Sequence, residues 1–305
     1  MSYKNILAVL DDSKHMPGVV AVANDLTRRF DARLVGLYAV HAAAETHGLQ
    51  DPWFAAGRAR AEAADLRLGG TPRARSAILF VGDGMGIATV TAARILQGQL
   101  RGESGEESTL AFERLPEVAL AKTYNTDAQV PDSAGTMTAL VSGVKTRAGS
   151  LGVDQRVASG DAAAVERGRV ATLLEEAEAR GMATGIVSTA RITHATPAAL
   201  YAHVPERDWE SDAALPAELR SSGFPDIARQ LVELPGDGPE VILGGGRAMF
   251  LPREAPDPEY PALRGSRLDG HDLIAEWRER HPDGAWVWNA PGLRALAPAN
   301  TPRVL

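Results

Sequence analysis

The feature that most constrains this chain is its alternation of short apolar runs with amphipathic stretches of helical length. Apolar runs of strand length lie at 76–81, 184–188 and 240–243, and helical patterns lie at 87–99, 170–180 and 226–234. Short apolar runs of this kind are typical of strands buried on both faces of a parallel sheet. The alternation therefore predicts an α/β fold, with a mainly parallel central sheet that is covered by helices.

The front of the chain has a smaller pattern of the same type. Residues 5–10 and 32–40 are apolar and strand-like, and an amphipathic stretch at 18–30 separates them, which predicts a βαβ segment. From about residue 51 the composition changes to alanine and arginine, and the glycines and proline at 69–72 indicate a loop or linker. We therefore expect a βαβ segment at 1–46, a helical or linker segment at 47–75, and a larger α/β domain at 76–305.

Composition excludes several classes of protein. With 305 residues, 45% of them hydrophobic, the chain can fill a core, and a net charge of −7 argues against a nucleic-acid partner. The absence of cysteine removes thiolate metal sites and disulfides. Apolar runs are too short to span a membrane, and the stretch Ile6–Leu10 is too short for a signal peptide, so we expect a cytoplasmic protein without a membrane partner.

Asp83 lies between two glycines, just after the first apolar run of the larger domain. In open α/β sheets, ligands bind at the carboxyl ends of strands, and a carboxylate in such a place suits a divalent cation. A tight turn explains the same residues equally well. A dinucleotide loop does not, because Ile87 stands where the third glycine of that pattern belongs.

Ser133 lies in a turn rich in proline and glycine, just before a helical run at 136–143. The free N–H groups and positive dipole at the start of a helix favour a bound phosphate and a developing alkoxide, so Ser133 is a candidate nucleophile. The commoner role for Asp132 or Ser133 in this position is that of a helix N-cap. Both interpretations remain open from the residues alone.

Three further polar residues follow the second strand. His194 and Thr196 are two residues apart, which would put them on the same side of an extended loop, where they could share a cation. Arg207 is either a surface charge or a bidentate clamp on two phosphate oxygens. A lone histidine such as His203 is more often structural than catalytic.

Four long segments of the sequence together resemble the alkaline phosphatase family. They occur in the family's order, over a region from about residue 51 to the last residue, at 77–86, 123–136, 193–197 and 241–247. The resemblance implies an α/β/α sandwich fold and a phosphomonoesterase that uses Zn²⁺ and Mg²⁺. The last segment, Gly244–Arg247, would be a loop with unusual backbone angles.

The resemblance also implies a role for each candidate residue. Ser133 would be the nucleophile that becomes phosphorylated, and Arg207 would hold the phosphate. Asp83 would bridge a zinc and the magnesium, while His194 and Thr196 would belong to the magnesium site. Phosphate monoesters would be the substrates, and the chain would form a homodimer, as family members commonly do.

The family's remaining metal ligands cannot be matched in this chain, so the resemblance implies a truncated domain with impaired activity. One zinc site would be missing, the other would retain only Asp83, and the magnesium site would lack its glutamate. The only Asp-x-x-x-His in the chain is Asp11 with His15, which lies in the front segment and which we attribute to chance. An alternative is a catalytically inert fragment that acts by binding.

Residues 2–13 and 29–38 resemble the start of a universal stress protein. This resemblance covers only about the first forty residues. In that family, Asp11 or Asp12 would approach a nucleotide, which makes a nucleotide-binding stress module a second alternative. The glycine-rich phosphate loop of that family is absent after Val40, so a βαβ segment without a ligand is the better interpretation.

Overall fold

The computed structural model describes residues 7–10, 77–115 and 119–305 of the chain. In chain order, its elements are β1 Leu7–Leu10, β2 Phe80–Gly82, α3 Ile87–Leu100, η1 Ala111–Arg114, α4 Ser133–Ser142, η2 Ala162–Ala164, α5 Val165–Gly168, α6 Leu173–Glu178, β3 Gly185–Arg191, α7 Ala195–Ala198, η3 Asp212–Ala214, α8 Ala217–Ser221, α9 Ile227–Val232, β4 Val241–Gly245, η4 Arg247–Phe250, α10 Leu273–Arg280, α11 Ala290–Ala295 and η5 Pro298–Asn300. The helix predicted at 18–30, the strand predicted at 32–40 and the segment 47–75 lie outside the described residues. The division into three regions therefore remains a prediction.

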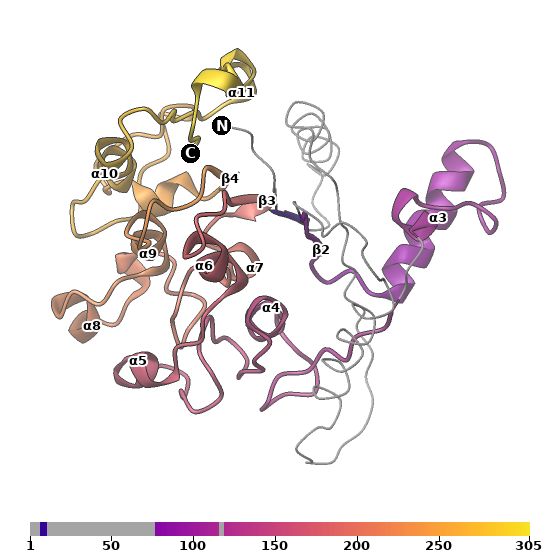
Figure 1. Cartoon of the computed structure of the whole chain (residues 1–305), viewed down its shortest axis with the longest axis horizontal. Coiled ribbons are helices and arrows are strands. Elements are labelled where there is room, and N and C mark those ends of the chain that lie inside the picture. Colours follow the sequence, from indigo (N-terminus) through magenta and orange to yellow (C-terminus); the bar gives the residue numbers. More distant parts are fainter. Residues whose placement is uncertain (1–6, 11–76, 116–118) are drawn as a thin grey trace.

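A parallel sheet forms the centre of the fold (Figure 1). The strands occur in the order β2-β1-β3-β4, and every neighbouring pair is parallel. Each of the three apolar runs of the larger domain contributes one strand, so the predicted α/β class with a mainly parallel sheet is confirmed. β2 begins later in the sequence than the apolar run at 76–81 and is shorter, because pairing with β1 begins only at Phe80.

The strand from the front of the chain belongs to this same sheet. Val9 of β1 pairs with Val81 of β2 on one side and with Ser188 of β3 on the other. β3 and β4 also pair with each other, with Ile186 opposite Ile242. The carboxyl ends of all four strands therefore lie at one edge of the sheet, which is where ligand sites form in such folds.

Helices cover the sheet with small and branched side chains. α7 packs on β3, α4 packs on α7 and α6, and α9 packs on α10. The main core combines these helices with Ile186 and Ile242 of the sheet and with the fully buried run 198–202, which contains three alanines. Small alanine side chains allow α7 to approach β3 and α4 closely, and this approach fixes the segment that carries His194 and Thr196.

A buried histidine joins α6 to the chain that follows α7. His203 is 3% exposed, its Nδ1 lies 2.7 Å from the Gly152 carbonyl oxygen, and its Nε2 lies 2.9 Å from Oε1 of Glu175. Glu175 also accepts from Arg169 at 2.7 Å and from the Thr172 N–H at 3.0 Å. The structural role predicted for His203 is therefore confirmed by these contacts.

A second buried charge cluster joins three loops near α9. The Arg267 side chain is fully buried and donates to Asp226 at 2.9 Å and to Asp269 at 2.5 Å. Asp226 is also the N-cap of α9, where it accepts from the Arg229 N–H. Asp212 lies 4.0 Å from the same guanidinium and accepts from the Leu268 N–H. This cluster holds together segments that are distant in sequence.

Among the helices of the described part, none is both long and apolar enough to cross a membrane.

Candidate functional site

Ser133 is the first residue of the ten-residue helix α4. Asp132 is the N-cap, because its Oδ1 accepts from the Gly135 N–H at 3.1 Å. The cap is thus made by Asp132, which leaves the Ser133 hydroxyl free to point away from the helix. Its Oγ lies 3.0 Å from both carboxylate oxygens of Asp83.

Asp83 follows β2 at the carboxyl edge of the sheet and receives a second hydroxyl there. Thr196 Oγ1 lies 2.7 Å from Asp83 Oδ2. The next residue, Gly84, has a φ of +67°, a conformation that glycine adopts without strain and that turns the chain sharply after the carboxylate. Hydroxyls from two distant segments therefore converge on the Asp83 carboxylate.

The expectation that His194 and Thr196 share one side of an extended loop is wrong. Residues Ala195–Ala198 form a short helix, α7, and His194 is its N-cap residue. A helical turn separates side chains that an extended strand would align, so Thr196 faces Asp83 while His194 faces Arg207.

Arg207 is not a solvated surface charge, since only 22% of its side chain is exposed. Its Nη1 donates to Asp132 Oδ2 at 3.1 Å, and its Nη2 lies 3.1 Å from Nε2 of His194. The guanidinium is thus held beside the start of α4 through the cap residue that directly precedes Ser133.

Hydrogen bonds, burial and nearby charges shift the pKa values of the two groups that contact Arg207. Burial opposes ionisation of Asp132, but donors from Gly135, Asn125 and Arg207 together hold its pKa below the usual value. Burial is the main cause that lowers the pKa of His194, and the charges of nearby arginines add to it. A neutral His194 can accept from Arg207 at Nε2, and its proton then lies on Nδ1. That Nδ1 is buried and has no hydrogen-bond partner among the described residues.

Sequence reasoning missed the polar residues that support this site. Asn125 donates to Asp132 Oδ1 at 2.9 Å, and Glu210 accepts a bidentate pair from Arg191 at 2.7 and 2.8 Å. Glu210 also accepts from Thr193, next to His194, at 2.6 Å. No spacing rule reveals these contacts. Asn125 carried a weak signal only, since it falls within one of the four family-like segments.

The donor atoms fit one hard cation better than they fit two zinc ions. Around Asp83 they are all oxygens, from a carboxylate and two hydroxyls, and Mg²⁺ prefers oxygen ligands. Zinc sites usually need three or four histidine, cysteine or carboxylate ligands. In the described ranges, a three-member cluster of such ligand atoms occurs only at Asp212, Asp226 and Asp269. The cluster does not include Asp83, and Arg267 already neutralises part of it.

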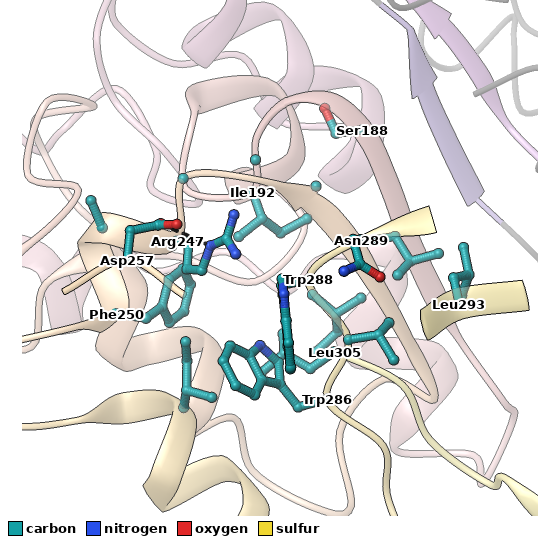
Figure 2. A pocket seen from close by; sticks show the side chains of 18 of the residues that line it. Ser188, Ile192, Arg247, Phe250, Asp257, Trp286, Trp288, Asn289, Leu293 and Leu305 are labelled. Carbon is teal, nitrogen blue, oxygen red and sulfur yellow. Dashed lines mark ion pairs between the residues drawn. The ribbon is translucent and has the colours of Figure 1, made fainter. Parts of the chain in front are cut away.

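A separate pocket lies at the end of β4. It has a volume of about 740 Å³ and an apolar lining that includes Trp286, Trp288 and Leu305 (Figure 2). Gly246, with a φ of +90°, turns the chain at the rim of this pocket. Gly244 and Gly245 belong to β4, so the loop with unusual backbone angles that was expected over Gly244–Arg247 is confirmed only at Gly246. Arg247 points into this pocket and pairs with Asp257 at 3.1 Å. None of the five candidate site residues lines it.

Comparison with known proteins places these observations in a family. The family model described as alkaline phosphatase matches residues 74–305. The tissue-nonspecific alkaline phosphatase of Gallus gallus is 51% identical over 229 residues, which are 73% of this chain and 44% of that protein. The tissue-nonspecific isozyme of Homo sapiens is 45% identical over 249 residues, or 80% of this chain and 47% of that protein.

The solved structure of a cold-active alkaline phosphatase from a psychrophilic Shewanella species is 27% identical, with a TM-score of 0.49, and the match covers 74% of this chain and 44% of that one. The chain therefore spans about half the length of the curated relatives that it matches.

Proposed function

The chain belongs to the alkaline phosphatase family, and from this premise we propose that its site hydrolyses phosphate monoesters through a phosphoserine formed on Ser133. The observation that carries the proposal is the position of the Ser133 hydroxyl. It lies at the N-terminus of α4, 3.0 Å from both oxygens of Asp83, with Arg207 held next to it by Asp132.

In the proposed reaction, Ser133 Oγ gives up its proton and attacks phosphorus, and the bond between phosphorus and the ester oxygen breaks. The departing oxygen takes up a proton through solvent, and the alcohol leaves. Water then attacks the phosphoserine, which releases inorganic phosphate and restores the serine hydroxyl. Phosphoryl transfer depends mainly on positioning and on neutralising charge. Arg207 supplies two parallel N–H donors for two phosphate oxygens, and the free N–H groups at the start of α4 supply further positive potential.

Asp83 orients the nucleophile in this scheme. Its carboxylate accepts a hydrogen bond from the Ser133 hydroxyl, which leaves the lone pairs of Oγ directed toward the incoming phosphorus. Thr196 holds Asp83 Oδ2 from the opposite segment and restricts its rotation. His194 positions Arg207 through its Nε2.

Asp83 and Thr196 would hold a divalent cation, and the oxygen donors favour Mg²⁺ for it. When bound, such a cation supplies positive charge that neutralises phosphate oxygens and lowers the pKa of a bound hydroxyl. His194, which the sequence also indicated for this site, is available to a cation only when Arg207 releases its Nε2. The zinc ions that the resemblance implies would require ligands beyond those gathered around Asp83. The resemblance also supports a homodimer, which the molar mass in solution would test.

A trapping experiment tests the proposal. The chain, loaded with Mg²⁺ and an aryl phosphate and then quenched in acid, should carry one phosphate group on the peptide that contains Ser133. Ser133→Ala should lose the label. Ser142→Ala is the matched control, because Ser142 lies on the same helix and its hydroxyl bonds to the backbone of the neighbouring residues Thr138 and Val144. A label that persists in Ser133→Ala would refute the phosphoserine.

A further inference from the structure

Behind the site lies a buried asparagine, Asn125, whose side chain bonds to Asp132 and, among the described residues, makes no hydrogen bond to Ser133 or Arg207. Asn125 is 3% exposed, and its Nδ2 donates to Asp132 Oδ1 at 2.9 Å. Resting on the proposed function, we infer that Asn125 is a positioning residue that sets the orientation of Arg207 for phosphate, acting through Asp132.

The two carboxylate oxygens of Asp132 have separate hydrogen-bond partners. Oδ1 accepts from the Gly135 N–H at 3.1 Å and from Asn125 at 2.9 Å. Oδ2 accepts from the Gly149 N–H at 2.9 Å and from Arg207 Nη1 at 3.1 Å. The donors on Oδ1 fix the rotation of the carboxylate, and this rotation determines where Oδ2 meets Arg207. Without Asn125, a single N–H would hold Oδ1.

Asn125 is itself held rigidly. Its backbone exchanges two hydrogen bonds with Ala128, at 3.0 and 3.3 Å, and the following residue, Thr126, donates its N–H to Thr146. Its Oδ1 lies against the backbone of α4, so closely that a β-carbon added at Gly135 would be only 2.3 Å from it. The Asn125 amide therefore has little conformational freedom, and the position of its loop determines where the amide meets the Asp132 carboxylate.

Stability alone does not account for an amide at this position. The Asn125 Oδ1 is buried and has no hydrogen-bond partner within residues 7–10, 77–115 and 119–305. A buried polar atom without a partner costs folding free energy, so an apolar side chain of similar size would suit the core better. What the asparagine contributes is the hydrogen bond that its amide Nδ2 donates to Asp132.

A double-mutant cycle tests the inference with inorganic phosphate as the probe, titrated calorimetrically. Asn125→Ala should raise the dissociation constant of phosphate about tenfold, as expected when one hydrogen bond of a bidentate pair is misaligned. In an Arg207→Ala background, the same substitution should change the constant less than about twofold, because its effect passes through Arg207. Equal weakening in both backgrounds would overturn the inference. Thr172→Ala, which removes a buried polar group at the N-cap of α6, is the control and should leave the constant unchanged.

A second measurement needs no phosphate. The guanidinium N–H signals of Arg207 in ¹H–¹⁵N spectra, assigned by their loss in Arg207→Lys, should be sharp in the unliganded chain and broadened in Asn125→Ala. Unchanged signals would overturn the inference. If the wild-type chain does not bind phosphate, the proposed function fails, and these spectra still decide the role of Asn125. Should the alanine variant not fold, Asn125→Ser serves in its place, since its hydroxyl is too short to reach Asp132.

Discussion

Replacing Glu175 by glutamine should destabilise the folded chain strongly at neutral pH. Burial opposes ionisation of this carboxylate, but the hydrogen bond and charge of His203, together with the donors Thr172 and Arg169, bring its pKa down to about 2 from an ordinary value of 4.5. One unit of pKa corresponds to about 1.4 kcal/mol, so the ionised form gains about 3 kcal/mol on folding. The side chain is only 17% exposed, so screening by solvent is limited.

The sign of the pH dependence follows from the lowered pKa. A carboxylate whose pKa is lower in the folded state stabilises the fold above its unfolded pKa, and this stabilisation is lost as the pH falls from 4.5 toward 2. Glu175→Gln should therefore lower the free energy of unfolding by about 3 kcal/mol at neutral pH. The difference from wild type should shrink by about 1.4 kcal/mol for each pH unit below 4.5.

Urea unfolding of the whole chain at neutral pH and at about pH 3.5 measures this difference directly. Glu176→Gln is a matched control, because Glu176 lies on the same helix, is half exposed and pairs with Arg180 one turn away. Such a surface pair contributes about 0.3–0.5 kcal/mol. Equal losses in the two variants, or a difference for Glu175→Gln that does not change with pH, would refute the reasoning.

Three further predictions concern the rest of the fold and the site. Arg267→Met leaves buried carboxylates without their counter-charge and should cost about 3–5 kcal/mol in urea unfolding; a loss below about 1 kcal/mol would contradict this. Asp83→Asn should abolish calorimetric Mg²⁺ binding, whereas His194→Ala should weaken it only slightly; equal effects would argue that His194 is a direct ligand. Gly152→Ala places a β-carbon 2.3 Å from the Ala202 carbonyl oxygen, whereas Gly160→Ala, at a glycine of similar φ, has open space around it. Gly152→Ala should therefore lower the free energy of unfolding by at least about 2 kcal/mol more than Gly160→Ala. Similar losses in the two variants would show that the backbone relaxes around Gly152.

The regular elements of this fold are largely readable from the sequence. β3 and β4 follow from their short apolar runs, and α3 follows from its helical pattern. The short helix α7 does not follow from it. Its four residues carry no period, Pro197 within it reads as a loop residue, and its conformation is fixed by packing of Ala195 and Ala198 in the core.

Some residues of the candidate site could likewise be predicted from the sequence, and others could not. Asp83 and Ser133 lie at a strand end and a helix start, which are positions that local patterns indicate, and the structure brings them within hydrogen-bond distance. The pairing of Arg207 with Asp132 and the support from Asn125 depend on how distant loops meet. A polar side chain has no sequence signature for the partner that it finds across the fold, so these contacts required a structure.

The central place of β1 in the sheet has a consequence for how the chain is made. Val9 of β1 pairs with Val81 of β2 and with Ser188 of β3. During synthesis, β2 is therefore available to one edge of β1 early, whereas β3, the partner of the other edge, is made only after roughly 180 further residues. At ribosomal rates of about 5–20 residues per second, that wait lasts about 9–36 s. During this interval β1 exposes unpaired N–H and C=O groups that another chain can bind. Pauses in translation before β3 should therefore favour aggregation of the nascent chain, and faster elongation through this region should improve the yield of folded protein.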